Sequence, residues 1–207
     1  ITYFPHPIND NLGVKTTPQV AKQYLKLDEE TNYLLFFGII RKYKGLDLLL
    51  EAIANGKLKD LNFKLLIVGE FYDDPEPYYE MIEKLNIKDR VIIHNEFVPT
   101  EDIKYYFSAA DLVTQTYHTA SQSGISQIAY NFENPMLVTN VGGLSEIIPH
   151  EKVGYVVEKD SEEIAAAIKD FFTNDRKHEF VKNLKEEKKK YSWDLFVEKM
   201  ANFYKNL

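Results

Sequence analysis

Cysteine is absent from this chain of 207 residues, which excludes disulfide bonds, thiolate metal sites and a thiol nucleophile. Positive charge is scarce as well, because 25 lysines and arginines stand against 32 acidic residues, giving a net charge of -7. This balance argues against a protein that binds nucleic acid through its overall charge. The sequence has no secretory signal, no Asn-x-Ser/Thr acceptor and no apolar run of the ~18 residues that a membrane span needs. These absences favour a cytoplasmic protein.

Several catalytic motifs are missing too. Neither G-x-G-x-x-G nor G-x-x-x-x-G-K-[ST] occurs, which argues against nicotinamide dehydrogenases and P-loop NTPases. The G-x-S-x-G motif of many hydrolases is absent. The five histidines are scattered without ligand spacing, so no metal site is expected. Asp73 and Asp74 could attract a divalent ion, but the prolines around them favour an ordinary exposed loop.

The chain does have the composition of a packed globule, with 44% hydrophobic residues. From about residue 33, short apolar runs alternate with amphipathic stretches, a pattern typical of βα units around a parallel sheet. Apolar residues at helical spacing predict intervening helices near 46–53, 81–85 and 164–171. We therefore expect a doubly wound, Rossmann-like α/β domain. Its six predicted strands are residues 33–38, 63–69, 91–94, 111–117, 136–139 and 153–157.

The two ends of the chain do not follow this repeat, so we divide it into three parts. Residues 1–30 contain prolines and a predicted short helix, and we interpret them as a linker or segment arriving from an amino-terminal domain. Residues 31–190 form the predicted Rossmann-like domain. Residues 191–207 contain apolar residues at helical spacing after Ser192, which predicts a capped terminal helix. Because the chain begins at Ile1 without a methionine, we expect it to be part of a longer protein.

Two cations lie in the turn after the first predicted strand, which ends at Gly38, itself a candidate ligand-binding residue. Arg41 and Lys44 precede a glycine and the start of a predicted helix. Since ligands of doubly wound sheets bind beyond the carboxyl ends of the strands, near helix N-termini, this pair predicts a phosphate site. The alternative is that solvent alone accounts for either cation.

Small and polar residues fill the turns after the fourth and fifth predicted strands. Hydroxyl groups and free amides at such turns suit an anion, although ordinary helix capping would use the same residues. A glycine pair lets either a ligand or another backbone come close. The residues concerned are Ser121, Gln122, Ser123, Gly124 and Gln127 after the fourth strand, and Gly142 and Gly143 after the fifth.

An ordered set of segments resembles the carboxyl-terminal, donor-binding domain of group-1 (family-4) glycosyltransferases of GT-B architecture. The first, LLFFGIIRKYKG (34–45), is similar to the family's strand followed by GRxxxxKG. The segment NPMLVTNVGGLSEII (134–148) is similar to its xPVVATxVGGxxEii stretch. The remaining matches, in order, are KLLIVGE (64–70), NEFVPTEDIKYYFSAADLVTQT (95–116), VGYVVEKDSEEIAAAI (153–168) and the final YSWDLFVEKMANFY (191–204).

The resemblance implies roles for particular residues. Lys44 matches the family's phosphate-binding lysine, whereas the family's arginine falls at Ile39, so Arg41 is the candidate replacement. Glu70 and Phe97, within two of the matching segments, are implied to contact the donor as well. The family's paired glutamates, which hold the sugar and the ribose, fall at Ala120 and Ile128, and neither is acidic; Gln127, beside the second, could hydrogen-bond a ribose instead.

The implied activity is a retaining, metal-independent glycosyltransferase, with this chain as the half that binds a UDP- or GDP-sugar. No cofactor is implied besides this substrate. The partners would be an acceptor glycan or lipid-linked sugar and an amino-terminal Rossmann domain to which the last helix crosses, so the isolated chain would be inactive. Membrane contact would be peripheral, at the inner face. The alternatives are a non-catalytic nucleotide-sugar-binding module, a nucleotide-sugar epimerase of the same architecture and a flavodoxin-like partner-binding domain.

Overall fold

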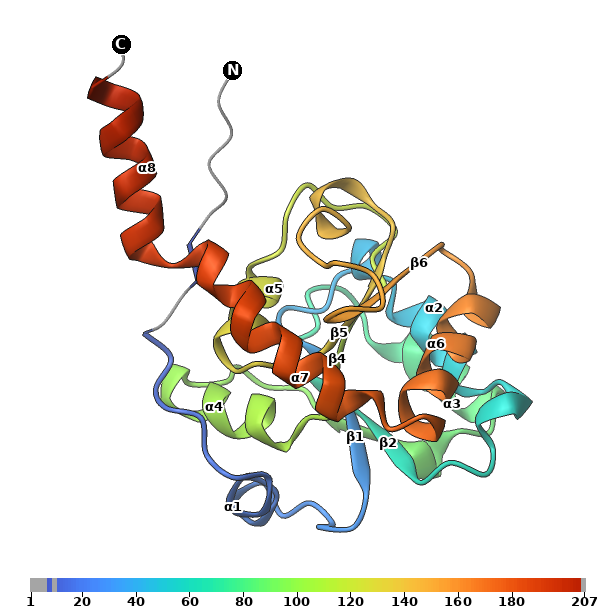
Figure 1. Cartoon of the computed structure of the whole chain (residues 1–207). Helices are drawn as coiled ribbons and strands as arrows, with labels where there is room; N and C mark the ends of the chain where they lie inside the picture. The colour runs from blue at the N-terminus through green and yellow to red at the C-terminus, as the bar shows by residue number, and fades with distance from the viewer. Residues whose placement is uncertain (1–6, 9–10, 206–207) are drawn as a thin grey trace.

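The computed structural model describes residues 7–8 and 11–205, and at its centre lies a sheet of six parallel strands. The strands are arranged in the order β3-β2-β1-β4-β5-β6 (Figure 1). This is the doubly wound order in which the direction of winding reverses between β1 and β4. The fold predicted from the sequence is confirmed. The strands are β1 Asn32–Phe37, β2 Phe63–Val68, β3 Val91–His94, β4 Leu112–Gln115, β5 Met136–Thr139 and β6 Gly154–Val157.

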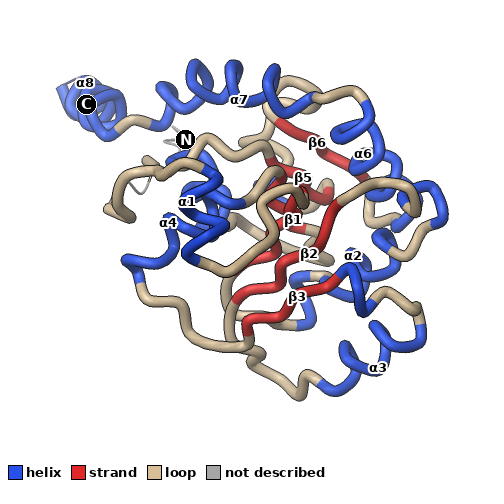
Figure 2. Tube along the Cα trace, turned by 90° about the horizontal axis from the view of Figure 1, so that it is seen from below, coloured by secondary structure: helices blue, strands red, loops and turns tan. Residues whose placement is uncertain are grey.

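Helices cover both faces of the sheet (Figure 2). The buried side chains form two clusters, one on each face, because strands covered on both sides are apolar throughout. Helices α2, α3 and α6 contribute to one cluster, and α1, α4 and α5 to the other. The helices are α1 Pro18–Tyr24, α2 Leu46–Ile53, α3 Glu76–Lys84, α4 Thr100–Ala109, α5 Gly124–Asn131, α6 Ser161–Thr173, α7 Arg176–Glu187 and α8 Trp193–Lys205.

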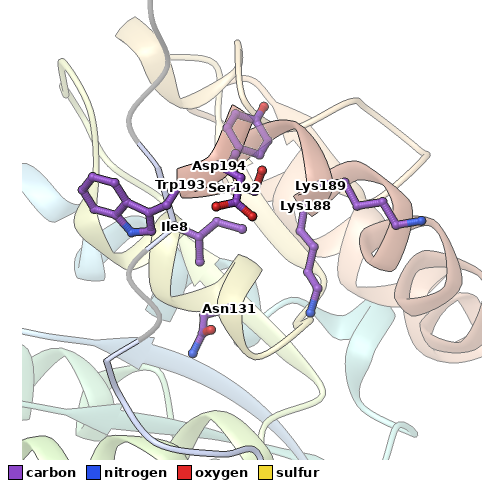
Figure 3. Close-up of a pocket in the computed structure, with 8 residues that line it drawn as sticks. Ile8, Asn131, Lys188, Lys189, Ser192, Trp193 and Asp194 are labelled. Carbon is purple, nitrogen blue, oxygen red and sulfur yellow. The ribbon is translucent and has the colours of Figure 1, made fainter. Parts of the chain in front are cut away.

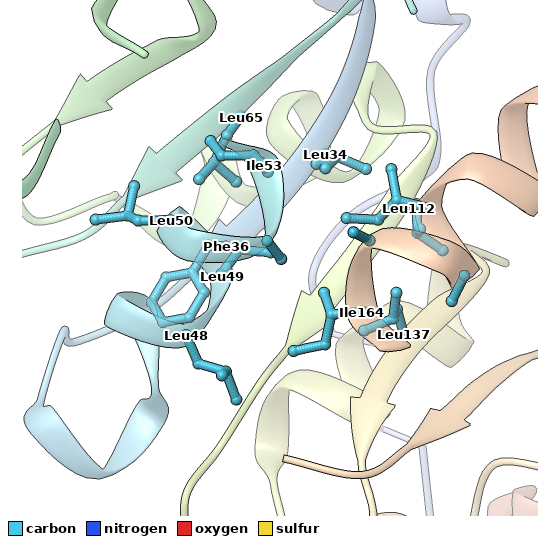
Figure 4. Close-up of a cluster of buried hydrophobic side chains, with 14 of the residues drawn as sticks. Leu34, Phe36, Leu48, Leu49, Leu50, Ile53, Leu65, Leu112, Leu137 and Ile164 are labelled. Carbon is cyan, nitrogen blue, oxygen red and sulfur yellow. The ribbon is translucent and has the colours of Figure 1, made fainter. Parts of the chain in front are cut away.

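The core beneath α2 shows why this helix is fixed firmly at the sheet. Leu49 and Ile53 of α2 face Leu34 of β1, and Ile164 of α6 closes the cluster (Figure 4). All four side chains are almost completely buried. Burying one such side chain contributes about 1.5–3 kcal/mol before the entropy of ordering it is subtracted. The N-terminus of α2 is therefore held rigidly beside the end of β1.

Helix α1 belongs to the segment that we interpreted as a linker. It packs against α4, and its Ala21 is fully buried. Tyr24 of α1 stacks on Tyr105 of α4, with ring centroids 3.8 Å apart, and its hydroxyl donates to Asp102. The residues of α1 are thus part of the packed body of the domain. The boundary near residue 30 stays a prediction.

Helix α8 extends away from the rest of the molecule (Figure 1). None of its residues is buried along its described length, and Trp193, Val197, Met200 and Tyr204 are exposed. The predicted terminal helix is present, while its predicted role in crossing to another domain stays a prediction. Among the described residues, no helix is both long and apolar enough to cross a membrane.

Candidate functional site

The reversal point of the sheet, between β1 and β4, is where two chain segments are clamped together. The hydroxyl of Thr116, just after β4, donates to the carbonyl of Gly45 at 2.7 Å. Gly45 has a φ of 64°, and a Cβ there would lie 1.9 Å from the Thr116 carbonyl oxygen. Only glycine fits this close approach. The turn after β1 is therefore held against the end of β4, at the crevice where doubly wound sheets bind ligands.

Lys44 lies inside this crevice, in the short 3-10 helix η1 (Lys42–Lys44). Its residue is only 7% exposed. A Cβ on Gly38 would lie 3.2 Å from the Lys44 Nζ and 3.2 Å from the Ile125 Cδ1, so both side chains pack close to this glycine. Most of this side chain is therefore enclosed by the protein, while its ammonium still reaches solvent.

The charge of Lys44 has no negative partner. Among the described residues, no carboxylate forms an ion pair with it, and its ammonium lies 5.8 Å from the centre of the Tyr117 ring. Burial, with a contribution from the nearby Arg41 charge, lowers the pKa of Lys44 from 10.5 to about 8. A buried cation without a counter-charge is costly, and an anionic ligand would remove that cost.

Arg41 is arranged differently from Lys44 although both are in the same turn. It is exposed, and its guanidinium lies 4.0 Å from the centre of the Tyr72 ring, in a cation–π contact. The turns after β1 and β2 are joined at this point, because Ile40 N donates to Glu70 O at 2.8 Å and Tyr72 N donates to Ile40 O at 3.0 Å. The structure thus places Arg41 at the rim, above the turn that contains Lys44.

Helix α5 begins next to Lys44. Ser123 caps it by accepting a hydrogen bond from Ile125 N at 3.2 Å, so the capping interpretation holds for this residue. The Ser123 hydroxyl also lies 3.4 Å from the hydroxyl of Tyr117, whose pKa is raised to about 12 by burial. Ser121, Gln122 and Gly124 are exposed around this helix start. The positive end of the α5 dipole is therefore accessible beside the Lys44 ammonium.

Gly142 and Gly143 accommodate backbone in this structure. Gly142 has a φ of 48°, and a Cβ there would lie 1.7 Å from the Ala120 carbonyl oxygen. The amide of Gly143 donates to the Ser121 carbonyl at 2.9 Å. Of the two uses predicted for a glycine pair, close approach of another backbone is the one observed. These contacts hold the turn after β5 against the turn after β4.

A pocket of about 230 Å³ opens on the other side of Gly38. It brings together three residues predicted for the site, Gly38, Glu70 and Phe97, with Ile39 on the same wall. Phe97 is 71% exposed, so its ring is available for stacking. Gly38 therefore lies between a buried cation and an apolar pocket.

The positions of the two expected glutamates carry no charge. Ala120 contributes its carbonyl to the contact with Gly142, and Ile128 packs against the core cluster that includes α5. Gln127, next to Ile128, has a buried Oε1 atom with no hydrogen-bond partner. An unpaired buried acceptor is costly, which leaves Gln127 available to a hydroxyl group.

Sequence reasoning missed two side chains at this edge. Tyr117 ends the predicted fourth strand and reads as one more apolar strand residue, yet its ring and hydroxyl contact Lys44 and Ser123. His118 follows it, and its Nε2 lies 2.9 Å from an Asp47 carboxylate oxygen at the start of α2. No local signal predicts the contact of Tyr117 with Lys44 or that of His118 with Asp47, because the two residues of each pair are about 70 positions apart in the sequence.

A second pocket, of about 370 Å³, lies at the far end of α5 and the base of α8 (Figure 3). Asn131, Ile8 and Trp193 line it together with Lys188 and Lys189. Both lysines are engaged, Lys188 with Glu133 and Lys189 with Glu186. This pocket therefore offers no uncompensated cation and is a weaker candidate for a phosphate site.

Asp73 and Asp74 line a further pocket of about 400 Å³ with Asp47 and Lys42. No group of three or more histidines or carboxylates in the described part of the chain is arranged to hold a metal ion. The expectation that this aspartate pair is an ordinary loop feature stays a prediction.

Comparison with known proteins gives the family. The family model described as "Glycosyl transferases group 1" matches residues 19–191. An uncharacterized glycosyltransferase of Methanocaldococcus jannaschii is 28% identical over 190 residues, which are 89% of this chain and 47% of the relative. The chain spans about half of the length of this relative.

Solved structures share the fold. The Anabaena protein HepE, in complex with UDP-glucose, has a TM-score of 0.82 and 19% identity, over 99% of this chain and 57% of that protein. The carboxyl-terminal domain of a group 1 glycosyl transferase from Francisella tularensis has a TM-score of 0.74 and 21% identity. It is matched over its whole length by 87% of this chain, which fits a carboxyl-terminal domain. The chain belongs to the group 1 glycosyltransferase family.

Proposed function

We propose that this chain is the donor-binding half of a retaining glycosyltransferase that uses a UDP- or GDP-sugar and no metal ion. The acceptor, a glycan or a lipid-linked sugar, would be held by an amino-terminal domain, and transfer would take place between the two. The protein would act in the cytoplasm, with at most peripheral contact to the inner membrane face. The family and the solved relative with bound UDP-glucose support a nucleotide-sugar donor.

The largely buried side chain of Lys44, with its unpaired ammonium, is the observation that carries this proposal. It lies at the reversal point of the sheet, beside the N-terminus of α5, without a carboxylate partner among the described residues. A diphosphate placed there would supply the missing negative charge and accept hydrogen bonds from Lys44 and the free amides. Arg41 could approach the same diphosphate from the rim.

These contacts define how the chain would assist the reaction. The bond from the sugar to the diphosphate breaks with negative charge developing on the leaving oxygen. Lys44 in a water-poor crevice stabilises that charge more strongly than a solvated lysine would. Lys44 and Arg41 together would offset the two negative charges of the bound diphosphate, which is why the proposal includes no metal ion there.

The uncharged residues at the expected glutamate positions favour one second candidate, a module that binds a nucleotide sugar without catalysis. Ala120 and Ile128 cannot hold a sugar hydroxyl through a carboxylate. Gln127, with its unpaired Oε1, could accept one hydrogen bond from a ribose or sugar hydroxyl in their place. Transfer of sugar by the protein joined to its amino-terminal domain would separate the enzyme from the module. The epimerase alternative would be recognised by a change of sugar configuration without an acceptor.

The decisive experiment is calorimetric titration of the chain with UDP and GDP. We expect binding to at least one, and Lys44→Met should weaken it by roughly 1.5–3 kcal/mol, or about 10–100-fold, the range for charge-assisted hydrogen bonds. The control is Lys42→Met, which removes an exposed cation from the same 3-10 helix. Equal affinities of the wild type and Lys44→Met would contradict the phosphate role, and no binding of either nucleotide would contradict the proposed function.

A further inference from the structure

The pocket that Gly38 lines and the Lys44 ammonium are close neighbours. Gly38 lines the pocket, and a Cβ on it would lie 3.2 Å from the Lys44 Nζ. The φ of Gly38 is 92°, a conformation that favours glycine, and a Cβ there would crowd both the Lys44 Nζ and the Ile125 Cδ1. A ligand whose diphosphate contacts Lys44 can therefore place its base in the pocket. This step rests on the proposed function.

The lining of the pocket is mainly apolar, and its polar side chains are those of Glu70 and Thr100. Phe37, Ile39, Phe97, Val98 and Ile103 provide its apolar walls. Glu70 is the single charged side chain among the lining residues. Among the described residues, none donates a hydrogen bond to the Glu70 carboxylate or forms an ion pair with it. The pocket thus offers a stacking surface and a free carboxylate, which only accepts hydrogen bonds.

No cation of the described residues pairs with that carboxylate. Ile39, at the position where the family resemblance implies an arginine, lines the same pocket and has no charge. Arg41 stacks on Tyr72 at 4.0 Å instead of pairing with Glu70. The carboxylate therefore keeps its full capacity to accept hydrogen bonds from a ligand.

The common nucleobases present different groups to such a carboxylate. Guanine has two adjacent donors, N1–H and the 2-amino group, which match the two oxygens of a carboxylate in a bidentate pair. Uracil has one N–H donor between two carbonyl oxygens, and each carbonyl would be repelled by the carboxylate. Adenine and cytosine each place an amino donor beside a ring nitrogen that is an acceptor. We propose that Glu70 makes this site selective for guanine, so that the donor is a GDP-sugar.

The test is a calorimetric series with GDP, IDP, UDP and ADP on the intact chain. IDP is guanosine diphosphate without the 2-amino group, so it isolates one of the two hydrogen bonds. We expect GDP to bind about tenfold or more tightly than UDP and ADP, with IDP between them, in line with the discrimination of a bidentate pair. Glu70→Gln should remove most of that preference, while Glu101→Gln, an exposed carboxylate outside the pocket, should keep it.

The possible results distinguish the guanine selectivity of Glu70 from the proposed donor site itself. UDP binding as tightly as GDP to the wild type would overturn the guanine selectivity and leave the donor site standing. The same holds if Glu70→Gln weakens all four nucleotides equally. Failure of all four to bind, with or without Glu70, would instead overturn the proposed function itself.

Discussion

Two lysines of this protein are equally buried and have opposite surroundings. Lys22 of α1 is 8% exposed, and its ammonium donates to the carbonyl oxygens of Glu29 at 2.8 Å and Thr31 at 2.9 Å. Lys44 is 7% exposed, yet no such acceptor lies within hydrogen-bond distance among the described residues. Burial alone therefore does not distinguish a structural lysine from a functional one. The distinction lies in whether the protein itself satisfies the charge.

The two lysines therefore contribute to the stability of the fold in opposite directions. The hydrogen bonds of Lys22 hold the end of α1 and the chain before β1 together, so its burial stabilises the fold. Lys44 loses much of its hydration on folding and gains no hydrogen bond or ion pair in the unliganded protein. Such unfavourable terms are concentrated at functional sites. A ligand with two phosphates would offset the desolvation free energy of Lys44. The ammonium of Lys22 is already hydrogen-bonded within the protein, so a ligand would not stabilise it further.

The largest effect is expected for Lys22→Met. This substitution leaves the Glu29 and Thr31 carbonyls without a donor, so it should lower the free energy of unfolding by about 2–4 kcal/mol. Urea denaturation followed by circular dichroism measures this loss. Nucleotide affinity of the folded variant should be unchanged, because α1 packs against α4 and does not reach the Lys44 crevice.

The control for that prediction is Lys42→Met, at an exposed lysine, which should change stability by no more than about 0.5 kcal/mol. A Lys22→Met variant as stable as this control would show that the two carbonyl contacts are energetically neutral. The contrast with Lys44 would then be lost.

Lys44→Met should act on stability in the opposite direction. The pKa of Lys44 is lowered from 10.5 to about 8, so the folded state pays for keeping the charge below pH 8. Removing that charge should raise the free energy of unfolding by about 1–3 kcal/mol at neutral pH. Between pH 8 and 10.5 the wild-type lysine loses its proton on folding, so wild-type stability rises and the difference should shrink.

Denaturation of wild type and Lys44→Met across this pH range measures the effect. If Lys44→Met is less stable than the wild type at neutral pH, the ammonium contributes to the fold and the comparison with Lys22 fails. Retained nucleotide binding in the same variant would contradict the phosphate role independently.

The fold could be predicted from the sequence because its central strands are unbroken apolar runs. Residues 63–69 were expected as a strand, and β2 is Phe63–Val68. The fourth strand was expected to continue to Tyr117, but β4 ends at Gln115. Just beyond β4, the Thr116 hydroxyl donates a hydrogen bond to the Gly45 carbonyl. This tertiary contact cannot be predicted from the local periodicity of the sequence.

The sequence placed Lys44 in a strand-to-helix turn, but the surroundings of its side chain could not be predicted. The charge and spacing of Lys44 pointed to phosphate, while solvation of the side chain remained an alternative. Its enclosure depends on Gly38, after β1, and on Tyr117 and Ile125, from the segment that follows β4 and begins α5. Whether a cation is buried without a partner is a property of such long-range packing, and so it could not be read from the turn alone.

The affinity for the donor should also depend on pH through Lys44, with a smaller effect than the changes in stability above. The diphosphate requires the protonated Lys44, whose pKa in the free protein is about 8. Affinity for a nucleotide sugar, whose phosphate diesters do not titrate near neutrality, should be constant below pH 8 and fall by up to about tenfold for each unit above it. Calorimetry in buffers of different ionisation enthalpy should detect proton uptake on binding.

Lys44→Arg is the matched variant, because arginine keeps its charge throughout this range. If it binds at all, its affinity should not decline above pH 8. A decline of the same size in wild type and Lys44→Arg would assign the titration to another group.

Metal chelation should have the smallest effect of all. In the proposed site the counter-charge for the diphosphate is Lys44 itself, so a divalent ion would compete with a cation that is already in place. EDTA should therefore change nucleotide affinity by less than about twofold, well below the tenfold that corresponds to 1.4 kcal/mol. The acidic loop provides the internal check, since Asp73→Asn combined with Asp74→Asn should leave both the affinity and its insensitivity to EDTA unchanged. A large loss of affinity with EDTA that this double variant reproduces would move the counter-charge from Lys44 to a metal held near Asp73 and Asp74. The unpaired lysine would then need a different explanation from the one that separates it from Lys22.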